Sequence, residues 1–233
     1  MASIVLGMTT AQIAALKTSQ IVALNTEDWA SLTSSQLAAL TTTQIQVVET
    51  QDLLALSTAQ FARGFTTAQI AALTTDQILS IETSDFSALT SRQIAALTTT
   101  QLAQGVTTEQ IQALGTAAIA ALTTRQIAQG LTSDQVVALT GVQAASLLTS
   151  QVAALSVANL QALETADLAA LTVAQVASLT TNQAANLTTD QVVALTAVQV
   201  AGLRTAQLSG MGTAQIAALE TGDIQALTTA QVS

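Results

Sequence analysis

The amino-acid sequence predicts an all-α solenoid of very short helices, with one helix for each eight-residue repeat. Two observations lead to this fold class. The phrase Thr-Thr-x-Gln-(Ile/Val/Leu)-x-Ala-Leu recurs along the whole chain of 233 residues, and so strict a period is the signature of a repeat architecture. Within the phrase, the two large apolar residues lie three positions apart, which is a helical spacing and not the alternation of a strand.

The Gln of each repeat serves as an anchor for counting. The anchors fall at Gln12, Gln20, Asp28 and so on to Gln231, which gives 28 of them. Three steps between anchors are nine residues long, and the others are eight. Because a repeat in a solenoid contacts only its neighbours, we expect residues 1–233 to form a single continuous array. That array is either an excerpt of a longer one or a unit that stacks end to end.

The residues before each anchor carry a signal for a helix start. Thr-x-x-Gln is the capping-box pattern, in which Thr accepts a hydrogen bond from an early backbone N–H and Gln reaches back to the Thr N–H. Thr66 with Gln69, Thr74 with Gln77 and Thr188 with Gln191 are examples. The second Thr of each pair is the more regular of the two, so the sequence leaves open which Thr begins the helix.

The three nine-residue steps indicate helix ends. Each contains a Gly followed by an apolar residue and Thr, at Gly64, Gly105 and Gly130. This order is typical of a Schellman motif, in which Gly adopts the left-handed conformation and the apolar residue folds back onto the helix. We therefore expect these three glycines to terminate helices in that conformation.

The period excludes one continuous helix. At about 100° per residue, eight residues advance by ~800°, so the apolar stripe would rotate by ~80° in each repeat. The helix must break once per octad, and helices this short are marginal unless neighbouring repeats stack on them. Trp29, Phe61 and Phe86 follow their anchors directly, and we expect them in the core. A β-solenoid with columns of Thr on its face is the alternative fold.

The acidic residues show a slower rhythm. All 14 fall in nine of the repeats, and apart from the repeat of Asp76 these are three or four repeats apart. The mean spacing predicts a coil with about 3.5 short helices per turn and acids along one side. Duplication of a longer block is the other explanation, since Thr132–Leu139 recurs almost unchanged as Thr188–Leu195.

Aspartate replaces the anchor Gln mainly where Glu precedes it by three residues. One interpretation is a ladder of carboxylates for Ca²⁺, which prefers six to eight oxygen ligands. The other is that acids favour helix N-termini and improve solubility. The four pairs are Glu49 with Asp52, Glu82 with Asp85, Glu164 with Asp167, and Glu220 with Asp223.

Composition excludes most site chemistry. The chain has no His and no Cys, so the usual general base, the thiolate nucleophile and the commonest metal ligands are missing. Lys17 is the only Lys and occupies an ordinary repeat position. The net charge of −9 opposes binding to a nucleic-acid backbone, and no apolar run reaches the length of a membrane span. We therefore predict no enzyme, no catalytic, cofactor-binding or metal-binding residues, no cofactor, and no small-molecule substrate.

The repeated phrase as a whole is similar to Thr-Thr-x-Gln-Ile-x-Ala-Leu arrays in very large surface or secreted proteins of Gram-negative bacteria, which are described as adhesin-like. The similarity covers nearly every repeat, and it implies an extracellular or cell-surface location and a role as a stalk. A short stretch from Leu131 to Leu139 resembles the start of a TAL-effector repeat, but the period and the charge exclude DNA reading.

Three functions remain open at this level. The first is an extended spacer of a surface or secreted protein. The second is a filament subunit that associates end to end, because an exposed solenoid end is an apolar surface. The third is the binding of ice or another surface through an ordered array of Thr.

Overall fold

The computed structural model describes residues 3–232, which contain short helices and no strand. The all-α solenoid is confirmed, and the alternative β-solenoid is wrong for this part of the chain. The chain divides into two compact units, the first ending at Leu114 and the second beginning at Gly115. Each unit is described by itself below.

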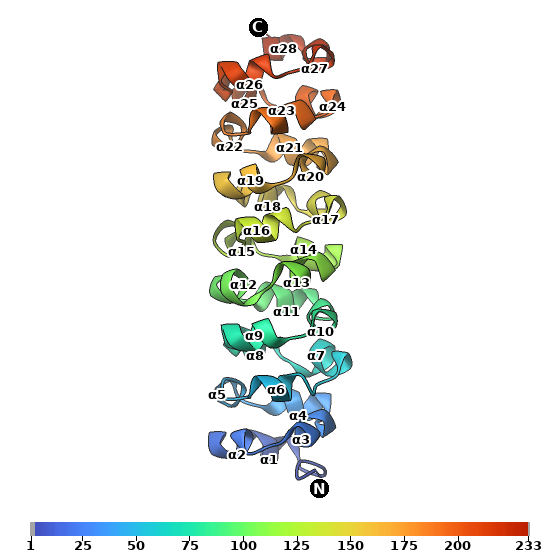
Figure 1. Ribbon diagram of the computed structural model, residues 1–233, viewed down its shortest axis with the longest axis vertical. Helices are drawn as coiled ribbons and strands as arrows, with labels where there is room; N and C mark the ends of the chain where they lie inside the picture. Colours follow the sequence, from blue (N-terminus) through green and yellow to red (C-terminus); the bar gives the residue numbers. More distant parts are fainter. Residues whose placement is uncertain (1–2, 233) are drawn as a thin grey trace. The chain divides into compact units, whose positions relative to one another are not determined.

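The first unit contains thirteen helices of four to seven residues in its described part (Figure 1). They are α1 (Thr10–Ala14), α2 (Thr18–Val22), α3 (Thr26–Ser31), α4 (Ser34–Ala39), α5 (Thr42–Ile45), α6 (Thr50–Leu53), α7 (Thr58–Gly64), α8 (Thr67–Ala72), α9 (Thr75–Ser80), α10 (Thr83–Ser87), α11 (Ser91–Ala96), α12 (Thr99–Gly105) and α13 (Thr108–Ala113).

The second unit continues with helices of the same kind, one for each anchor. They are α14 (Thr116–Ala121), α15 (Thr124–Gln129), α16 (Ser133–Val137), α17 (Gly141–Ser146), α18 (Thr149–Ala154), α19 (Val157–Ala162), α20 (Thr165–Ala170), α21 (Val173–Ser178), α22 (Thr181–Ala185), α23 (Thr189–Ala194), α24 (Ala197–Ala201), α25 (Thr205–Gly210), α26 (Thr213–Ala217), α27 (Thr221–Ala226) and α28 (Thr229–Val232).

The first Thr of each pair, and not the second, is the residue that caps the helix. Thr66 has extended backbone angles (φ −76°, ψ 160°), and its hydroxyl accepts from the N–H of Gln69, whose side chain accepts from the Thr66 N–H in return. At the other end of the helix, Leu73 is extended as well. Leu73 and the next cap, Thr74, therefore make two consecutive extended residues that turn the chain into the following helix.

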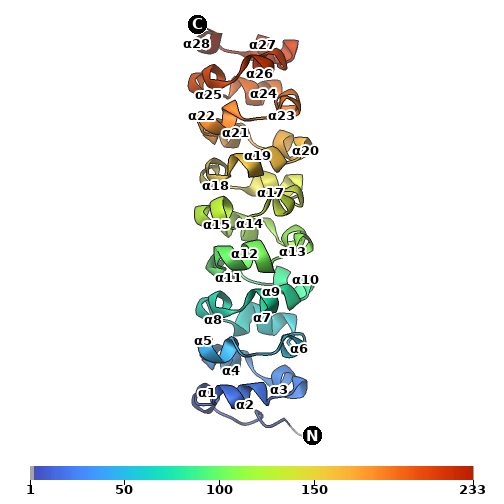
Figure 2. The same ribbon diagram turned by 60° about the vertical axis from the view of Figure 1, so that its left-hand side comes forward.

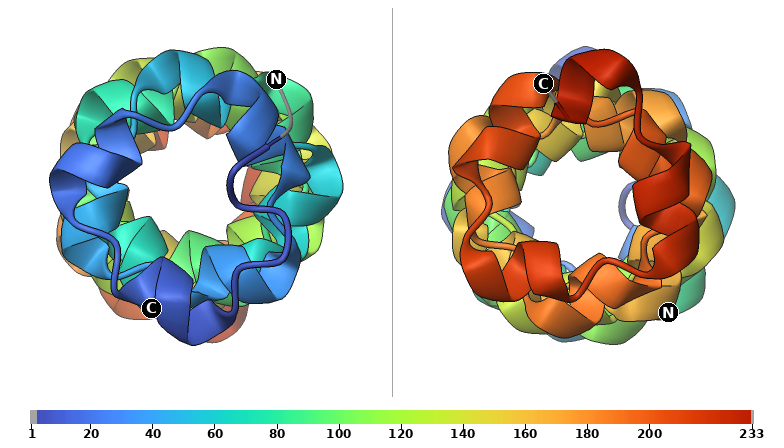
Figure 3. Two further views of the ribbon diagram at one scale, coloured as in Figure 1. Left: turned by 90° about the horizontal axis from the view of Figure 1, so that it is seen from below. Right: turned by 90° about the horizontal axis from the view of Figure 1, so that it is seen from above.

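Within each unit, the helices form a coil with between three and four helices per turn. The main helix contacts join helices three places apart, such as α1 with α4 and α17 with α20. Figure 2 shows α1, α2 and α3 following one another through the first turn of the first unit. Seen end-on, the helices nearest the viewer form a ring, in the first unit in the left view and in the second unit in the right view (Figure 3). Together with the hydrogen bonds described below, this spacing agrees with the predicted 3.5 repeats per turn.

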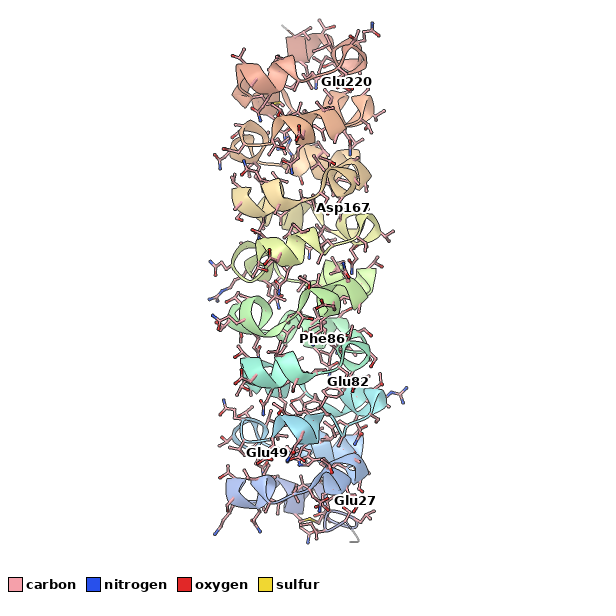
Figure 4. All side chains as sticks on the ribbon, in the orientation of Figure 1. Glu27, Glu49, Glu82, Phe86, Asp167 and Glu220 are labelled. Carbon is pink, nitrogen blue, oxygen red and sulfur yellow. The ribbon has the colours of Figure 1, made fainter. Side chains whose placement is uncertain are left out.

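The core of each unit consists of the two large apolar residues of the repeat. The residue after the anchor is fully buried, as Ile70 and Val192 are, and the last Leu of the repeat is nearly so. Trp29, Phe61 and Phe86 occupy this position and are at most 1% exposed, which confirms the prediction that they lie in the core. Phe86 is labelled in Figure 4.

The predicted Schellman motifs are wrong. Among the described residues only Gly7 has a positive φ, while Gly64 and Gly105 continue their helices and Gly130 has a φ of −106°. Close packing is the reason for glycine at Gly105, because a Cβ there would lie 2.9 Å from the carbonyl oxygen of Thr75 in α9. The extra residue of the repeat widens the last helical turn, where the N–H of Val106 donates to Gln101 O.

We expect Gly105→Ala to destabilise the protein by about 1–3 kcal/mol, because the new methyl group would collide with backbone that cannot move aside. Gly222→Ala is the matched control, since Gly222 is helical and nothing lies within 4 Å of its missing Cβ. That change should stabilise by about 0.5–1 kcal/mol through helix propensity. Urea denaturation of both variants measures the difference, and equal midpoints would contradict the packing role of Gly105.

Candidate functional site

The most regular polar feature of the structure is a hydrogen bond, usually buried, from most of the anchor Gln side chains to the preceding turn of the coil. Gln101 in α12 donates through Nε2 to the carbonyl oxygens of Ile70 (2.8 Å) and Leu73 (2.6 Å). These two carbonyls lie at the end of α8, four helices earlier. Each such side chain thus joins one turn of the coil to the next.

The geometry explains why the anchor is Gln. At Gln69, Oε1 accepts from both the N–H and the hydroxyl of Thr66, and Nε2 donates at 2.7 Å to the carbonyls of Leu37 and Leu40. The amide is 1% exposed, yet all four of its hydrogen-bonding positions are used. A Glu could cap the helix equally well, but its ionised carboxylate could not donate to the two carbonyls.

These links form a series in each unit, which we call the glutamine ladder. Asn159 makes a shortened version with one bond, from Nδ2 to the carbonyl of Leu131. In the first unit the ladder consists of Gln36, Gln44, Gln60, Gln69, Gln77, Gln93, Gln101 and Gln110. In the second unit it includes Gln151, Gln175, Gln183, Gln191, Gln199, Gln207, Gln215 and Gln231.

The sequence interpretation assigned the anchor Gln only to capping and missed its second role. One signal was available. Glu caps as well as Gln in a capping box, yet Glu stands at none of the 28 anchors. That exclusion indicates that the donor half of the amide is needed as well as the acceptor half.

Aspartate anchors interrupt the ladder, because a carboxylate cannot donate to the preceding turn. Asp28 accepts from the N–H groups of Ile4 and Asn25. Asp85 accepts from the hydroxyl of Thr58 at 2.6 Å. Oδ1 of Asp52 is buried and has no hydrogen-bond partner.

The surroundings shift the pKa values of three of these carboxyl groups. Burial, followed by the charges of Glu49 and Asp28, raises the pKa of Asp52 to about 6. Burial and then the charge of Glu164 raise the pKa of Asp167. Burial also acts to raise the pKa of Asp28, but the hydrogen bonds that its carboxylate accepts outweigh burial and hold the pKa below its ordinary value.

Glu49, Glu82 and Glu164 each precede an Asp anchor by three residues and occupy the N-cap position of the helix. Their side chains make no capping hydrogen bond. Their side chains are exposed, and Figure 4 labels Glu49 and Glu82 in the first unit and Glu220 in the second. Residues 3–232 contain no group of three or more acidic, His or Cys side chains placed to hold a metal ion. In the same range, no helix is long and apolar enough to cross a membrane.

The last helices of the second unit enclose an apolar cavity of about 340 Å³. Its walls include buried Leu208 of α25 and the partly or fully exposed side chains Ile216, Leu219, Ile224 and Leu227. Its lining is mainly apolar and has few polar groups to orient a small ligand.

Comparison with protein families gives five matches to one repeat family, at residues 45–80, 78–116, 107–141, 160–197 and 197–229. Together the matched segments cover well over half of the chain. The chain belongs to the ALTTAQ repeat family. The six letters of the family name occur unaltered at Ala226–Gln231. There Ala226 is the last residue of α27, the N–H of Thr228 donates to Oε1 of Gln231, and Gln231 donates through Nε2 to the carbonyl of Leu203. A comparison with curated proteins gives no match to the chain.

Proposed function

We propose that this ALTTAQ repeat chain is a non-enzymatic structural spacer, an extended stalk in a bacterial surface or secreted protein of the adhesin type. The glutamine ladder is the observation that carries the proposal. It joins each turn to the one before through buried hydrogen bonds, and it repeats the same joint along each unit instead of building one specialised site. Such a design adds length and stiffness with every repeat.

Electron microscopy of the purified chain over a range of concentrations tests this proposal. A spacer gives discrete rods whose length is the same at every concentration and grows when whole repeats are added. Compact particles would contradict the role. For the location, antibodies against the chain should label intact cells that carry the gene, and labelling only after the cells are broken open would contradict a surface role.

A second candidate function, a filament subunit, is favoured by the polar groups of the first and last turns. Gln12 and Gln20 are exposed, and their Oε1 atoms accept the cap N–H groups, while in the described structure their Nε2 atoms donate to no carbonyl. Within residues 3–232, no Gln of the ladder donates to the carbonyls of Leu219 and Leu227, which line the cavity of the second unit. The first turn of a second copy carries donors of the kind that such carbonyls accept elsewhere in the ladder.

Repeated head-to-tail contact produces open fibres when its rotation does not close into a ring. In the same microscopy series, a filament subunit gives fibres that lengthen as concentration rises. The double variant Gln12→Glu and Gln20→Glu should abolish them, because the carboxylates would meet carbonyl oxygens. Gln51→Glu is the control, since the Gln51 side chain is exposed and bonds only to Glu49.

A further inference from the structure

Asn159 shows that a side chain one methylene shorter than Gln still spans the gap between turns. Its Nδ2 donates at 2.9 Å to the carbonyl of Leu131, 28 residues earlier, and the side chain is 5% exposed. A protonated aspartic acid has nearly the same shape and can also donate one hydrogen bond, whereas an ionised aspartate can donate none. The anchor position is therefore sensitive to a proton wherever Asp occupies it.

The register of the ladder identifies the carbonyls opposite Asp52. Gln44 of α5 donates to the end of α1, and Gln60 of α7 donates to the end of α3. Helix α6 lies between these two, so Asp52 takes the position opposite the end of α2, at Ile21 and Leu24. No donor to the carbonyl oxygen of Leu24 is seen in the part of the chain that the structure describes.

Asp167 occupies the same register position in the second unit and is 6% exposed. By the same register, it stands opposite the carbonyl of Leu139, again 28 residues earlier. Asp85 differs, because the hydroxyl of Thr58 donates to its Oδ1. At Asp167 the corresponding residue of the earlier helix is Gly141, which has no hydroxyl to offer.

We propose that Asp52 and Asp167 are proton-operated joints between turns of the coil, one in each unit. When the side chain is protonated, Asp52 donates to Leu24 O and Asp167 donates to Leu139 O, as Asn159 donates to Leu131 O. When the proton leaves, carboxylate and carbonyl oxygens face each other without a hydrogen between them, and the joint loosens.

The charged groups around both joints favour the protonated form. The charges of Glu49, which precedes α6, and of Asp28 on α3 act on Asp52, whereas Glu27 on α3 and Asp76 on α9 are exposed. The helix opposite Asp52 is α2, and the only cation near it is Lys17, which precedes the helix and is exposed. One turn further on, Glu82 and Asp85 of α10 add negative charge. The charge of Glu164, which precedes α20, acts on Asp167, whereas Asp134 on α16 and Asp190 on α23 are exposed, and α17 carries no charge.

The sign of the effect follows from the raised pKa values. A folded-state pKa above the ordinary 3.8 means that the proton stabilises the fold. This stabilisation is complete below pH 3.8 and is lost as the pH rises through about 6 for Asp52. Mild acid should thus tighten these joints, although Asp28, whose pKa is lowered, opposes the trend at the acid end.

The test is urea denaturation of the full chain at constant ionic strength from pH 7.5 to pH 4.5, comparing wild type with the double variant Asp52→Asn and Asp167→Asn. The new carboxamides donate at every pH. At the upper pH the unfolding constant of wild type should exceed that of the variant by about a hundredfold. This ratio should fall toward one as the pH is lowered. The carboxyl ¹³C signal of Asp52 should titrate near its raised pKa.

Asp76→Asn with Asp190→Asn is the matched control, because both residues are exposed acids in helices that contact the joints. It removes the same charge and should leave the pH dependence of wild type almost unchanged. Three outcomes would overturn the proposal. The ratio of the unfolding constants of wild type and the joint variant could stay constant with pH, or the control variant could lose the pH dependence to the same extent as the joint variant. Alternatively, calcium chloride could stabilise wild type and not the variant at the upper pH, which would show that a cation fills the joint.

Discussion

Replacing Gln101 by Glu should lower the free energy of unfolding by about 3–5 kcal/mol at neutral pH. The amide is 3% exposed and donates to the carbonyls of Ile70 and Leu73. A carboxylate of the same shape would keep the bond to the Thr98 N–H but would place a buried negative charge against two carbonyl oxygens. Far-UV circular dichroism during urea denaturation measures the loss.

The variant Gln12→Glu distinguishes the contribution of the ladder to stability from the contribution of the helix cap. Gln12 caps its helix in the same way, through Oε1 and the Thr9 N–H, but it is exposed and links to no earlier turn. Its change to Glu should alter the free energy of unfolding by no more than about 0.5 kcal/mol. Equal losses for the two variants would mean that capping alone explains the anchor Gln, and the ladder would contribute nothing.

Phe86→Ala should destabilise the chain by about 3–5 kcal/mol, because it removes a fully buried ring from the core. The repeat consensus places Ile, Val or Leu at this position, so Phe86→Leu provides a graded comparison and should cost only about 1 kcal/mol. Hydrogen exchange of the two variants shows how far the damage spreads.

In a solenoid each repeat depends on its neighbours, so protection should fall first in α7 and α13, the helices that pack against α10. Loss confined to α10 alone would contradict cooperative stacking. Val198→Ala is a suitable surface control, since Val198 is 68% exposed and its truncation should have little effect.

Much of this fold follows from the repeat itself. The octad cannot sustain one continuous helix, and Thr66 with Gln69 shows the predicted box of reciprocal hydrogen bonds. The aromatic residue Trp29 lies in the core because its position in the phrase is the one that always points inward. These features depend on local spacing, which a single sequence displays directly.

The contacts between turns could not be predicted from local spacing. Gln101 and Leu73 are 28 residues apart, and no local pattern states which carbonyl a side chain will meet. Gly105 was assigned the wrong role for a related reason. Its neighbour in sequence suggested a left-handed helix end, whereas the backbone of Thr75, thirty residues earlier, is what excludes a side chain there.

The nine-residue repeats show how the coil tolerates a change in length. Gln183 donates to carbonyls 28 and 31 residues earlier. Gln77 donates to carbonyls 29 and 32 residues earlier, because a nine-residue repeat lies between Gln77 and its partners. The same bond forms in both cases. Each joint therefore depends on the number of repeats between its partners, and a gene of this kind can gain or lose whole repeats by slippage or unequal crossing-over without disturbing the fold on either side. Strains carrying this gene should differ in repeat number far more readily than in the residues of the repeat.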